Sequence, residues 1–369
     1  MNTSSQPEAN PVLTTYTEVE TALRDERLTP WKPIQAVVAD EQATRRQGDV
    51  SAKFLQLRQR NLDTLSLWLG ERHPPAHTWL RKLLSPPFSL ANVTALVPSI
   101  QATADALIDR AQAAGEMDLV DYAMRLPLLV ISDILGVPHQ DSERLRRWSV
   151  DMSPLVHANS SAPQRERSLH RLWASRQYFE KLVMQRRAQP RDDFISALIA
   201  TQAQTHLRDD ELVANATDLF FAAQVTTGPF IHRAARTLLT RPDDWELLQH
   251  HPQFMPKAIE ELLRVASPAH LCFRQAKEDM ELYGRSLKQG QTITLSLRSA
   301  NYDPQQFHTP DQLDLLRSPN HHLAFGAGIH YCLGAHLVRA EAQVALSTLF
   351  RRVPREKLIH TNLEEKPRV

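Results

Sequence analysis

Residues 321–346, HHLAFGAGIHYCLGAHLVRAEAQVAL, carry the most informative local pattern of the chain. Three of the chain's ten glycines fall within nine residues here: Gly326, Gly328 and Gly334. Such crowding predicts positive φ angles or a backbone held close to a flat group. After Cys332 the pattern is strongly helical, so the cysteine is expected at a helix N-terminus, where free amides stabilise a thiolate. Two interpretations are open from these residues alone: an iron-binding thiolate shielded by Phe325, or a buried free cysteine at a glycine-rich turn.

The composition limits the function classes. The chain has 369 residues, 42% of them hydrophobic, with 43 Lys and Arg against 42 Asp and Glu. This balance gives no sign of a nucleic-acid partner. The polar start MNTSSQPEAN has no apolar core of a secretory signal, and no apolar run reaches the ~18 residues of a membrane span. Two cysteines exclude a disulfide framework, which favours a reducing cytoplasm.

Most of the chain has the spacing of amphipathic helices. Helices are predicted over residues 15–28, 102–113, 126–134, 168–186 and 209–239, the first capped by Thr15 or Thr17. Gly228 and Pro229 predict a kink in the longest of these helices. Residues 282–297 predict a hairpin with turns at Gly284 and Gly290. We expect a mainly α fold with a small β region, a single domain over residues 1–369, and disorder in residues 1–12.

The cysteine segment, Phe325-Gly326-x-Gly328-x-His330-x-Cys332-x-Gly334, resembles the haem-binding signature of cytochrome P450 enzymes. The pair Glu261-x-x-Arg264, which would share one helix face, resembles the family's ExxR pair. His322 matches the third partner of that buried network, and residues 300–307 (ANYDPQQF) match the segment that precedes the cysteine loop. The resemblance extends over about residues 15–352. It implies haem b with Cys332 as the axial thiolate of the iron.

Haem carries two propionates, and buried carboxylates require charged donors. His77 and Arg81, one turn apart on a predicted helix, match the family's propionate-binding helix. Arg274 and His330 match the other two propionate donors. The resemblance also assigns three cofactor contacts: Phe325, Gly326 and Gly334.

One segment departs from the family. Residues 222–227, AAQVTT, match the oxygen-activating helix, and Thr226 is kept, but Val225 stands where the family has an acid. Valine cannot relay a proton. Three alternatives are open. Gln224, Thr227, the substrate or water supplies the route for protons, or the enzyme does not perform ordinary oxygen cleavage. In the third, Val225 packs against its neighbours and the proton relay runs elsewhere. The chain is also short before residue 15 and after residue 352, which predicts a reduced sheet and a more open pocket.

The resemblance implies a monooxygenase that uses O₂ and acts on a small or medium apolar metabolite in specialised metabolism. Electrons from NAD(P)H are expected through a separate reductase and an iron-sulfur ferredoxin. Two alternatives are a haem-thiolate enzyme that uses peroxide or catalyses a rearrangement or dehydration, and a non-catalytic haem-binding scaffold. Residues 155–163 are expected to form a mobile lid. By family position, the pocket residues are Phe221, Ala222, Val225, Ala269, His270 and Leu271.

Overall fold

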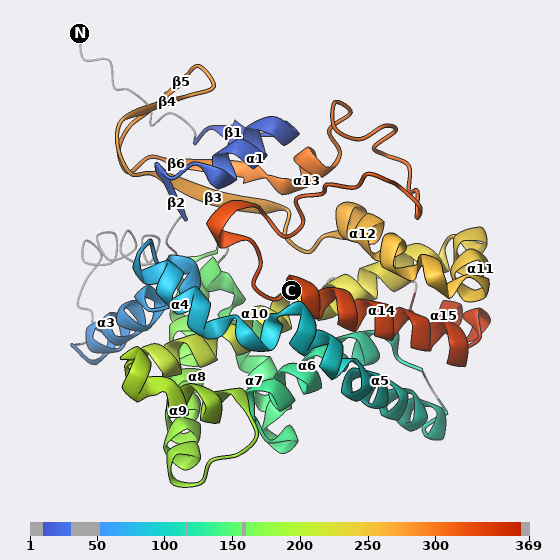
Figure 1. Cartoon of the computed structure of the whole chain (residues 1–369), viewed down its shortest axis with the longest axis horizontal. Helices are drawn as coiled ribbons and strands as arrows, with labels where there is room; N and C mark the ends of the chain where they lie inside the picture. The colour runs from blue at the N-terminus through green and yellow to red at the C-terminus, as the bar shows by residue number, and fades with distance from the viewer. Residues whose placement is uncertain (1–9, 31–51, 116, 157–159, 363–369) are drawn as a thin grey trace. The chain divides into compact units, whose positions relative to one another are not determined.

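The computed structural model describes residues 10–30, 52–115, 117–156 and 160–362, and its elements are labelled in Figure 1. The chain forms two compact units. Unit 1 comprises residues 1–31 and 257–333, and unit 2 comprises residues 32–256 and 334–369. The chain therefore passes between the units three times, and neither unit is one continuous segment. The single domain expected over residues 1–369 stays a prediction.

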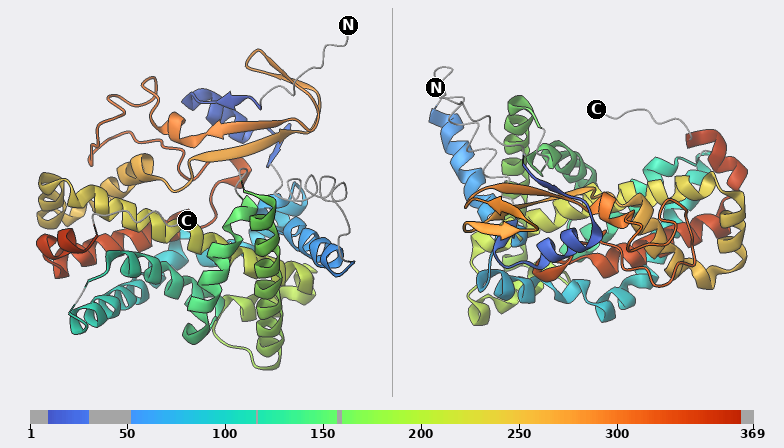
Figure 2. Two further views of the ribbon diagram at one scale, coloured as in Figure 1. Left: turned by 180° about the vertical axis from the view of Figure 1, so that it is seen from behind. Right: turned by 90° about the horizontal axis from the view of Figure 1, so that it is seen from above.

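Unit 1 contains a four-stranded sheet in the order β1-β6-β3-β2 and a separate two-stranded hairpin of β4 and β5 (Figures 1 and 2). Strand β1 is parallel to β6, whereas β3 is antiparallel to both β6 and β2. Unit 1 contains the elements β1 (Val12–Leu13), α1 (Tyr16–Arg24), β2 (Leu28–Pro30), β3 (Leu271–Ala276), β4 (Met280–Leu282), β5 (Arg285–Leu287), β6 (Thr292–Ser296), α13 (Leu297–Asn301) and the 3₁₀ turn η5 (Gly328–His330). It also contains α12 (Met255–Ala266) except the first two residues of that helix.

Local chemistry explains most of these elements. Thr15 caps α1 by accepting from the amide of Glu18, whose carboxylate accepts from Thr15 in return, as predicted. Gly284 has φ 69° in the turn that joins β4 to β5. The hairpin predicted over residues 282–297 is wrong beyond this turn, because β6 pairs with β3 and β1 instead of β5.

Two residues of the segment 1–12, for which we predict disorder, take part in the sheet of unit 1. Pro11 accepts a hydrogen bond from the amide of Thr294, and Val12 belongs to β1. Residues 1–9 lie outside the described part of the chain. The sheet expected to be reduced thus has four strands, and it packs on a buried apolar cluster that includes Leu13, Val19 and Leu295.

Unit 2 is helical, and several of its helices pack around the long α10 (Figure 1). No helix among the described residues is long and apolar enough to cross a bilayer. Unit 2 contains the elements α3 (Ala52–Ser66), η1 (Leu69–Glu71), α4 (Ala76–Leu84), η2 (Pro86–Phe88), α5 (Leu90–Ala113), α6 (Leu119–Leu135), α7 (His139–Met152), η3 (Ser153–Val156), α8 (Ala162–Ala188), α9 (Phe194–Thr205), α10 (Asp209–Leu239), α11 (Pro242–His250), η4 (Pro252–Phe254), α14 (Ala335–Arg352) and α15 (Arg355–Asn362).

Helix α10 continues through Gly228 and Pro229 for 31 residues. A Cβ atom at Gly228 would lie 2.7 Å from the sulfur of Met124 on α6 and 3.1 Å from the carbonyl oxygen of Ala123. The glycine therefore permits close packing of α10 against α6, a role that the sequence prediction of a kink missed.

The segment expected to be a lid is partly helical. Leu155 lies in η3 and is buried in an apolar cluster with Met152 and Leu169, and α8 begins at Ala162. Residues 157–159 lie outside the described part of the chain. The loop predicted over residues 155–163 is therefore wrong at both of its ends.

Candidate functional site

The cysteine loop of unit 1 is closed by its own backbone. The amide of Cys332 donates to the carbonyl oxygen of Phe325 at 3.0 Å. Gly326 and Gly328 have φ angles of 70° and 71°, which only glycine adopts readily. A Cβ at Gly328 would also lie 2.7 Å from the carbonyl oxygen of Leu23, so side chains are excluded by contact as well as by φ. The loop thus holds Cys332, which forms no disulfide, in a defined backbone.

Helix α14 begins at Ala335 with Gly334 as its N-cap, so Cys332 precedes the cap by two residues. This placement agrees with the predicted start of a helix after the cysteine. Gly334 has φ −85°, and a Cβ there would meet nothing within 4 Å. Its backbone therefore does not itself require glycine, and its lack of a side chain leaves space beside the loop.

Glu261 and Arg264 form a fully buried ion pair, each side chain having 0% exposure. Arg264 donates from Nε and Nη2 to the two carboxylate oxygens, both at 2.8 Å. Glu261 also accepts from the amide of Asp314, from Nε of Arg317 and from the side-chain amide of Asn320. Burial acts to raise the pKa of Glu261, but the hydrogen bonds from Arg264, Asp314 and Arg317 outweigh it and hold the pKa below its ordinary value.

The remaining donors of Arg264 bind backbone carbonyls. They reach the carbonyl oxygens of Asn301 and Pro310 at 2.8 Å and that of Gln312 at 3.2 Å. The side chain of Asn301 in turn accepts from the amide of Leu323 at 2.7 Å, just before the cysteine loop. The pair on α12 therefore holds the segments that lead into the loop.

His322 was expected to bond to Glu261 and Arg264, and this expectation is wrong. Its Nε2 lies 3.2 Å from a carboxylate oxygen of Glu260, and its Nδ1 accepts from the amide of Ala324. Arg317 and Asn320 occupy the position predicted for it. The histidine side chain is nevertheless buried, with 3% exposure.

Basic side chains occupy the positions predicted to bind carboxylates in each of the two units. On α4, His77 is buried, and its pKa is lowered first by burial and then by the nearby charges of Arg81 and His73. In unit 1, Arg274 on β3 is buried and donates to the sulfur of Cys272 at 2.9 Å and to a backbone carbonyl. No carboxylate of the described residues bonds to Arg274. Buried guanidinium groups and clustered like charges favour an anionic ligand.

The site residues predicted on α10 lie on two different sides of the helix. Val225 and Thr226 are partly exposed and Ala222 is exposed, so these three share an open face. The hydroxyl of Thr226 donates to the carbonyl oxygen of Ala222 at 3.0 Å. Gln224 and Thr227 are buried, with 6% and 3% exposure. The structure therefore does not bring Gln224 to the face of Thr226, because a helix places residues two apart on opposite sides.

Phe221, expected to line the pocket, is 4% exposed. Its ring lies 5.7 Å from that of Trp68 within an apolar cluster of unit 2. This side chain is a core residue. In unit 1, Ala269 packs against the core, His270 is exposed, and Leu271 keeps 51% of its surface exposed.

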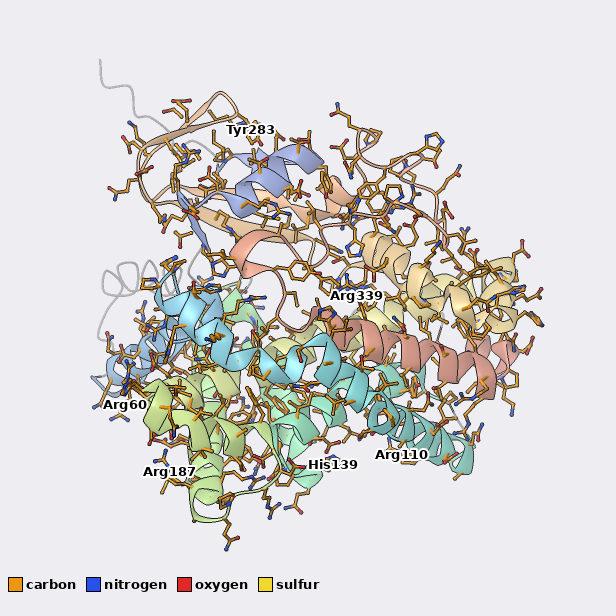
Figure 3. All side chains as sticks on the ribbon, viewed as in Figure 1. Arg60, Arg110, His139, Arg187, Tyr283 and Arg339 are labelled. Atoms are coloured by element: carbon orange, nitrogen blue, oxygen red, sulfur yellow. The ribbon has the colours of Figure 1, made fainter. Side chains whose placement is uncertain are left out.

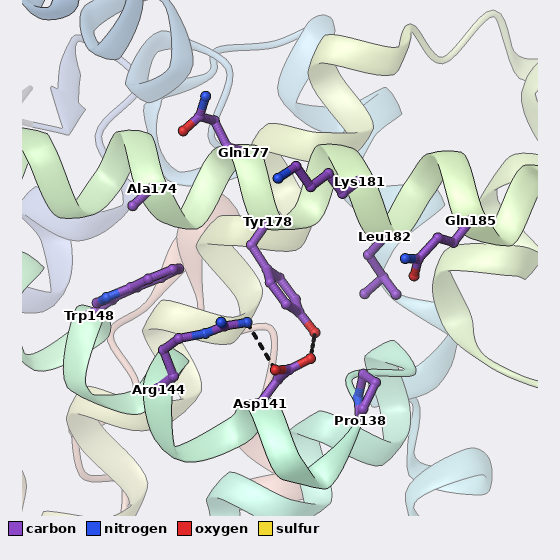
Figure 4. A pocket seen from close by; sticks show the side chains of 10 residues that line it. All are labelled: Pro138, Asp141, Arg144, Trp148, Ala174, Gln177, Tyr178, Lys181, Leu182 and Gln185. Carbon is purple, nitrogen blue, oxygen red and sulfur yellow. Dashed lines mark hydrogen bonds and ion pairs between the residues drawn. The ribbon is translucent and has the colours of Figure 1, made fainter.

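A groove of about 330 Å³ lies between α7 and α8 (Figure 4). There Arg144 and the hydroxyl of Tyr178 both donate to Asp141, at 2.9 and 3.0 Å. Arg144 also lies 5.5 Å from the ring centroids of Trp148 and Tyr178. These polar groups satisfy one another, and none of the residues predicted for the site lines this groove.

Comparison with known proteins agrees with this arrangement. A family model described as "Cytochrome P450" matches residues 240–356, which include the Glu261–Arg264 pair and the cysteine loop. The chain is 37% identical over 298 residues to cytochrome P450 CYP107DY1 of Priestia megaterium, covering 78% of this chain and 72% of the relative. It is 35% identical over 287 residues to the steroid C26-monooxygenase of Mycobacterium tuberculosis strain CDC 1551, covering 77% of each.

The chain belongs to the cytochrome P450 family. A solved structure of P450BioI in complex with an acyl carrier protein ligated to hexadec-9Z-enoic acid superimposes with a TM-score of 0.83 at 30% identity, covering 93% of this chain and 85% of that one. Members of this family use haem b held by a cysteine thiolate and receive electrons from separate redox proteins.

The residues of this P450 fit haem b. A glycine-lined loop presents a cysteine that forms no disulfide, and the buried guanidinium of Arg274, which bonds to no carboxylate of the described residues, suits a propionate. Cys272 is the other cysteine, but it lies inside β3, opposite Leu295. The sequence prediction did not include Arg317, Asn320 or the acid Asp218 on α10.

Proposed function

We propose that this P450 is a haem-dependent monooxygenase that oxidises a small or medium, largely apolar metabolite, with Cys332 as the iron ligand. The observation that carries the proposal is the closed loop in which the amide of Cys332 donates to the carbonyl oxygen of Phe325, with two glycines of positive φ in the chain between them. Four basic residues, His77, Arg81, Arg274 and His330, would hold the propionates. The relative named steroid C26-monooxygenase inserts oxygen into its own substrate, which supports the same reaction class here.

When bound, haem supplies the oxidising chemistry, with O₂ as co-substrate and NAD(P)H as the ultimate reductant. The part played by α10 is to arrange substrate and protons. Ala222 and Val225 offer an apolar surface on its open face, which suits an apolar substrate. The Thr226 hydroxyl, now bonded to Ala222, can rotate to hold a proton donor or water at Oγ1.

A second reaction class is favoured by one residue. Val225 has no carboxyl that could relay a proton to Thr226. Gln224 is buried on the opposite side of the helix from Thr226, so its side chain does not replace that acid. A haem-thiolate enzyme that uses peroxide, or that rearranges or dehydrates its substrate, needs no such acid. Labelled dioxygen distinguishes the two reaction classes.

We further propose an iron-sulfur ferredoxin as electron donor, with a reductase before it, acting in the cytoplasm. By family position, Arg72, Lys82 and Arg339 are candidate docking cations. Arg72 is paired with Glu211 at 2.9 Å. Lys82 is exposed, and Arg339, labelled in Figure 3, is partly exposed and donates to the carbonyl oxygen of Ala335. Reduction by an acidic ferredoxin should slow as salt rises and slow further in Lys82→Glu and Arg339→Glu. A rate indifferent to salt and to both substitutions would argue for another docking face.

The ligand assignment is tested by Cys332→Ser. Because the thiolate determines the spectrum of the ferrous carbon monoxide complex, this variant should lose the thiolate-type Soret shift. Cys272→Ser is the matched control and should keep it. Retention of the band in Cys332→Ser would show that the assignment of the iron ligand is wrong.

A further inference from the structure

Helix α10 leaves one face uncovered although most of its length is buried. Between residues 217 and 228, the residues that keep exposed surface are Asp218, Leu219, Ala222, Ala223, Val225 and Thr226. Asp218 and Val225 are seven residues apart and are aligned within about 20° around the helix axis, with Ala222 between them. The acid that is absent at Val225 is thus present two turns earlier on the same face.

Asp218 has no hydrogen bond or ion pair with any described residue. The helices packed against α10 in unit 2 include α3, α6, α7, α8, α11 and α14. Among the residues that the structure describes, no charged group on them shifts the carboxyl, since burial alone raises the pKa of Asp218 to about 7. The carboxyl therefore lies on the uncovered face without a partner among the described residues, where a ligand can reach it.

The spacing distinguishes two roles for this carboxyl. Eight residues separate Asp218 from Thr226, which corresponds to about 12 Å along the helix axis. A carboxyl at that distance cannot form a hydrogen bond to a group held by the Thr226 hydroxyl. It can, however, bind one end of a molecule whose other end lies beside Thr226.

We propose that Asp218 binds a cationic nitrogen of the substrate and so presents a position about 12 Å away for oxidation beside Thr226. This inference rests on the proposed function and specifies its substrate class: an apolar body with a basic or quaternary nitrogen at one end. Ala222 and Val225 lie between the two ends and contact the apolar body. A cation restores the missing partner of the acid, and the ion pair forms where water is partly excluded.

The test uses the haem-loaded full chain and three linear ligands of about ten carbons, long enough for the 12 Å spacing. They end in trimethylammonium, hydroxyl or carboxylate. A quaternary nitrogen has no lone pair and cannot bind iron itself. Binding is followed by the ligand-induced spin-state change. The ammonium ligand should bind about tenfold more tightly than the alcohol, as expected for one charge-assisted contact, and the carboxylate should bind most weakly.

Asp218→Asn, which keeps the size of the side chain, should abolish the advantage of the ammonium ligand and leave the affinity for the alcohol unchanged. In the native protein, affinity for the ammonium ligand should rise with pH through about 7, because the carboxylate is the binding form. In Asp218→Asn that dependence should disappear. Asp210→Asn, at a surface acid of the same helix paired with Arg208, is the control and should change neither affinity.

Native protein that binds the ammonium ligand no more tightly than the alcohol, or not at all, overturns the proposal. Undiminished binding of the ammonium ligand by Asp218→Asn does so too. The proposed function fails separately, if the ferrous carbon monoxide complex lacks the thiolate-type band whatever the ligand.

Discussion

Two acids of this P450, the buried Glu261 and the partly buried Asp218, are in opposite circumstances. Glu261 on α12 accepts from Arg264, Arg317, Asn320 and a backbone amide, and its pKa lies below the ordinary value. Asp218 on α10 has no partner among the described residues, and burial raises its pKa to about 7. The first acid stabilises the fold when ionised, and the second when protonated.

The difference indicates which acid serves structure and which serves function. A buried charge that is fully hydrogen-bonded fixes the segments that its partners belong to, here those before the cysteine loop. A partly buried acid without partners among the described residues, such as Asp218, fixes no other segment and retains its capacity to bind a ligand. The comparison can be tested by removing one member of each arrangement.

The largest effect is expected from Arg264→Ala. The substitution leaves Glu261 as a buried charge without its principal partner and removes three hydrogen bonds to backbone carbonyls. Breaking a buried pair in this way costs about 3–5 kcal/mol. Little folded, haem-loaded protein should be recovered, as measured by soluble yield and Soret absorbance.

Arg146→Ala is a matched control, because Arg146 and Glu143 are also three residues apart on a helix but are much more exposed, at 27% and 40%. Its cost should stay below about 1 kcal/mol. Equal yields of the two variants would contradict a structural role for the buried pair.

The sequence predicted those parts of the molecule that depend on neighbouring residues. The capping of α1 by Thr15, the positive φ of Gly326 and Gly328, and the Glu261–Arg264 pair follow from spacings of a few residues. The helical pattern of the residues after Cys332 predicted the start of α14 in the same way.

Partners distant in sequence could not be predicted. Arg317 and Asn320 are 56 and 59 residues from Glu261, and nothing near either residue indicates that contact. The predicted hairpin failed because β6 pairs with β3, which precedes the hairpin, and with β1, which lies near the start of the chain. Asp218 was missed although a local signal existed, since an acid in the apolar run ATDLFFAAQV is aligned with Val225 at helical spacing.

A smaller effect, opposite in sign, is expected from Asp218→Asn. A raised pKa in the folded state means that the native protein is most stable below the ordinary pKa of 3.8 and loses that stability as pH rises through about 7. The variant lacks this loss. It should therefore be more stable than the native protein at pH 8, by up to about 4 kcal/mol, and the difference should shrink towards pH 5. Urea denaturation at several pH values measures it.

Glu341 on α14, whose pKa burial raises to about 8, provides a background that both proteins share. Only the difference between native protein and Asp218→Asn reports on Asp218. A difference that does not change between pH 5 and pH 8 would mean that the carboxyl has an unrecognised partner.

The smallest effect on stability is expected from Thr226→Ala, whose main effect is on function. The hydroxyl bonds only to a carbonyl oxygen of its own helix, so its loss should change the free energy of unfolding by less than about 1 kcal/mol. If O₂ is activated on the open face of α10, the variant should consume NADH normally while product falls several-fold and peroxide is released. Labelled dioxygen should still mark the product that does form.

If the product yield is instead unchanged and the product carries no label, the hydroxyl has no part in proton delivery, and the peroxide-driven or non-oxygenative reaction favoured by Val225 is the correct one. Asp218→Asn should not mimic this uncoupling, because a carboxyl about 12 Å from Thr226 acts on substrate position and not on the proton. Uncoupling of equal size in both variants would therefore show that the two ends of the face work as one relay.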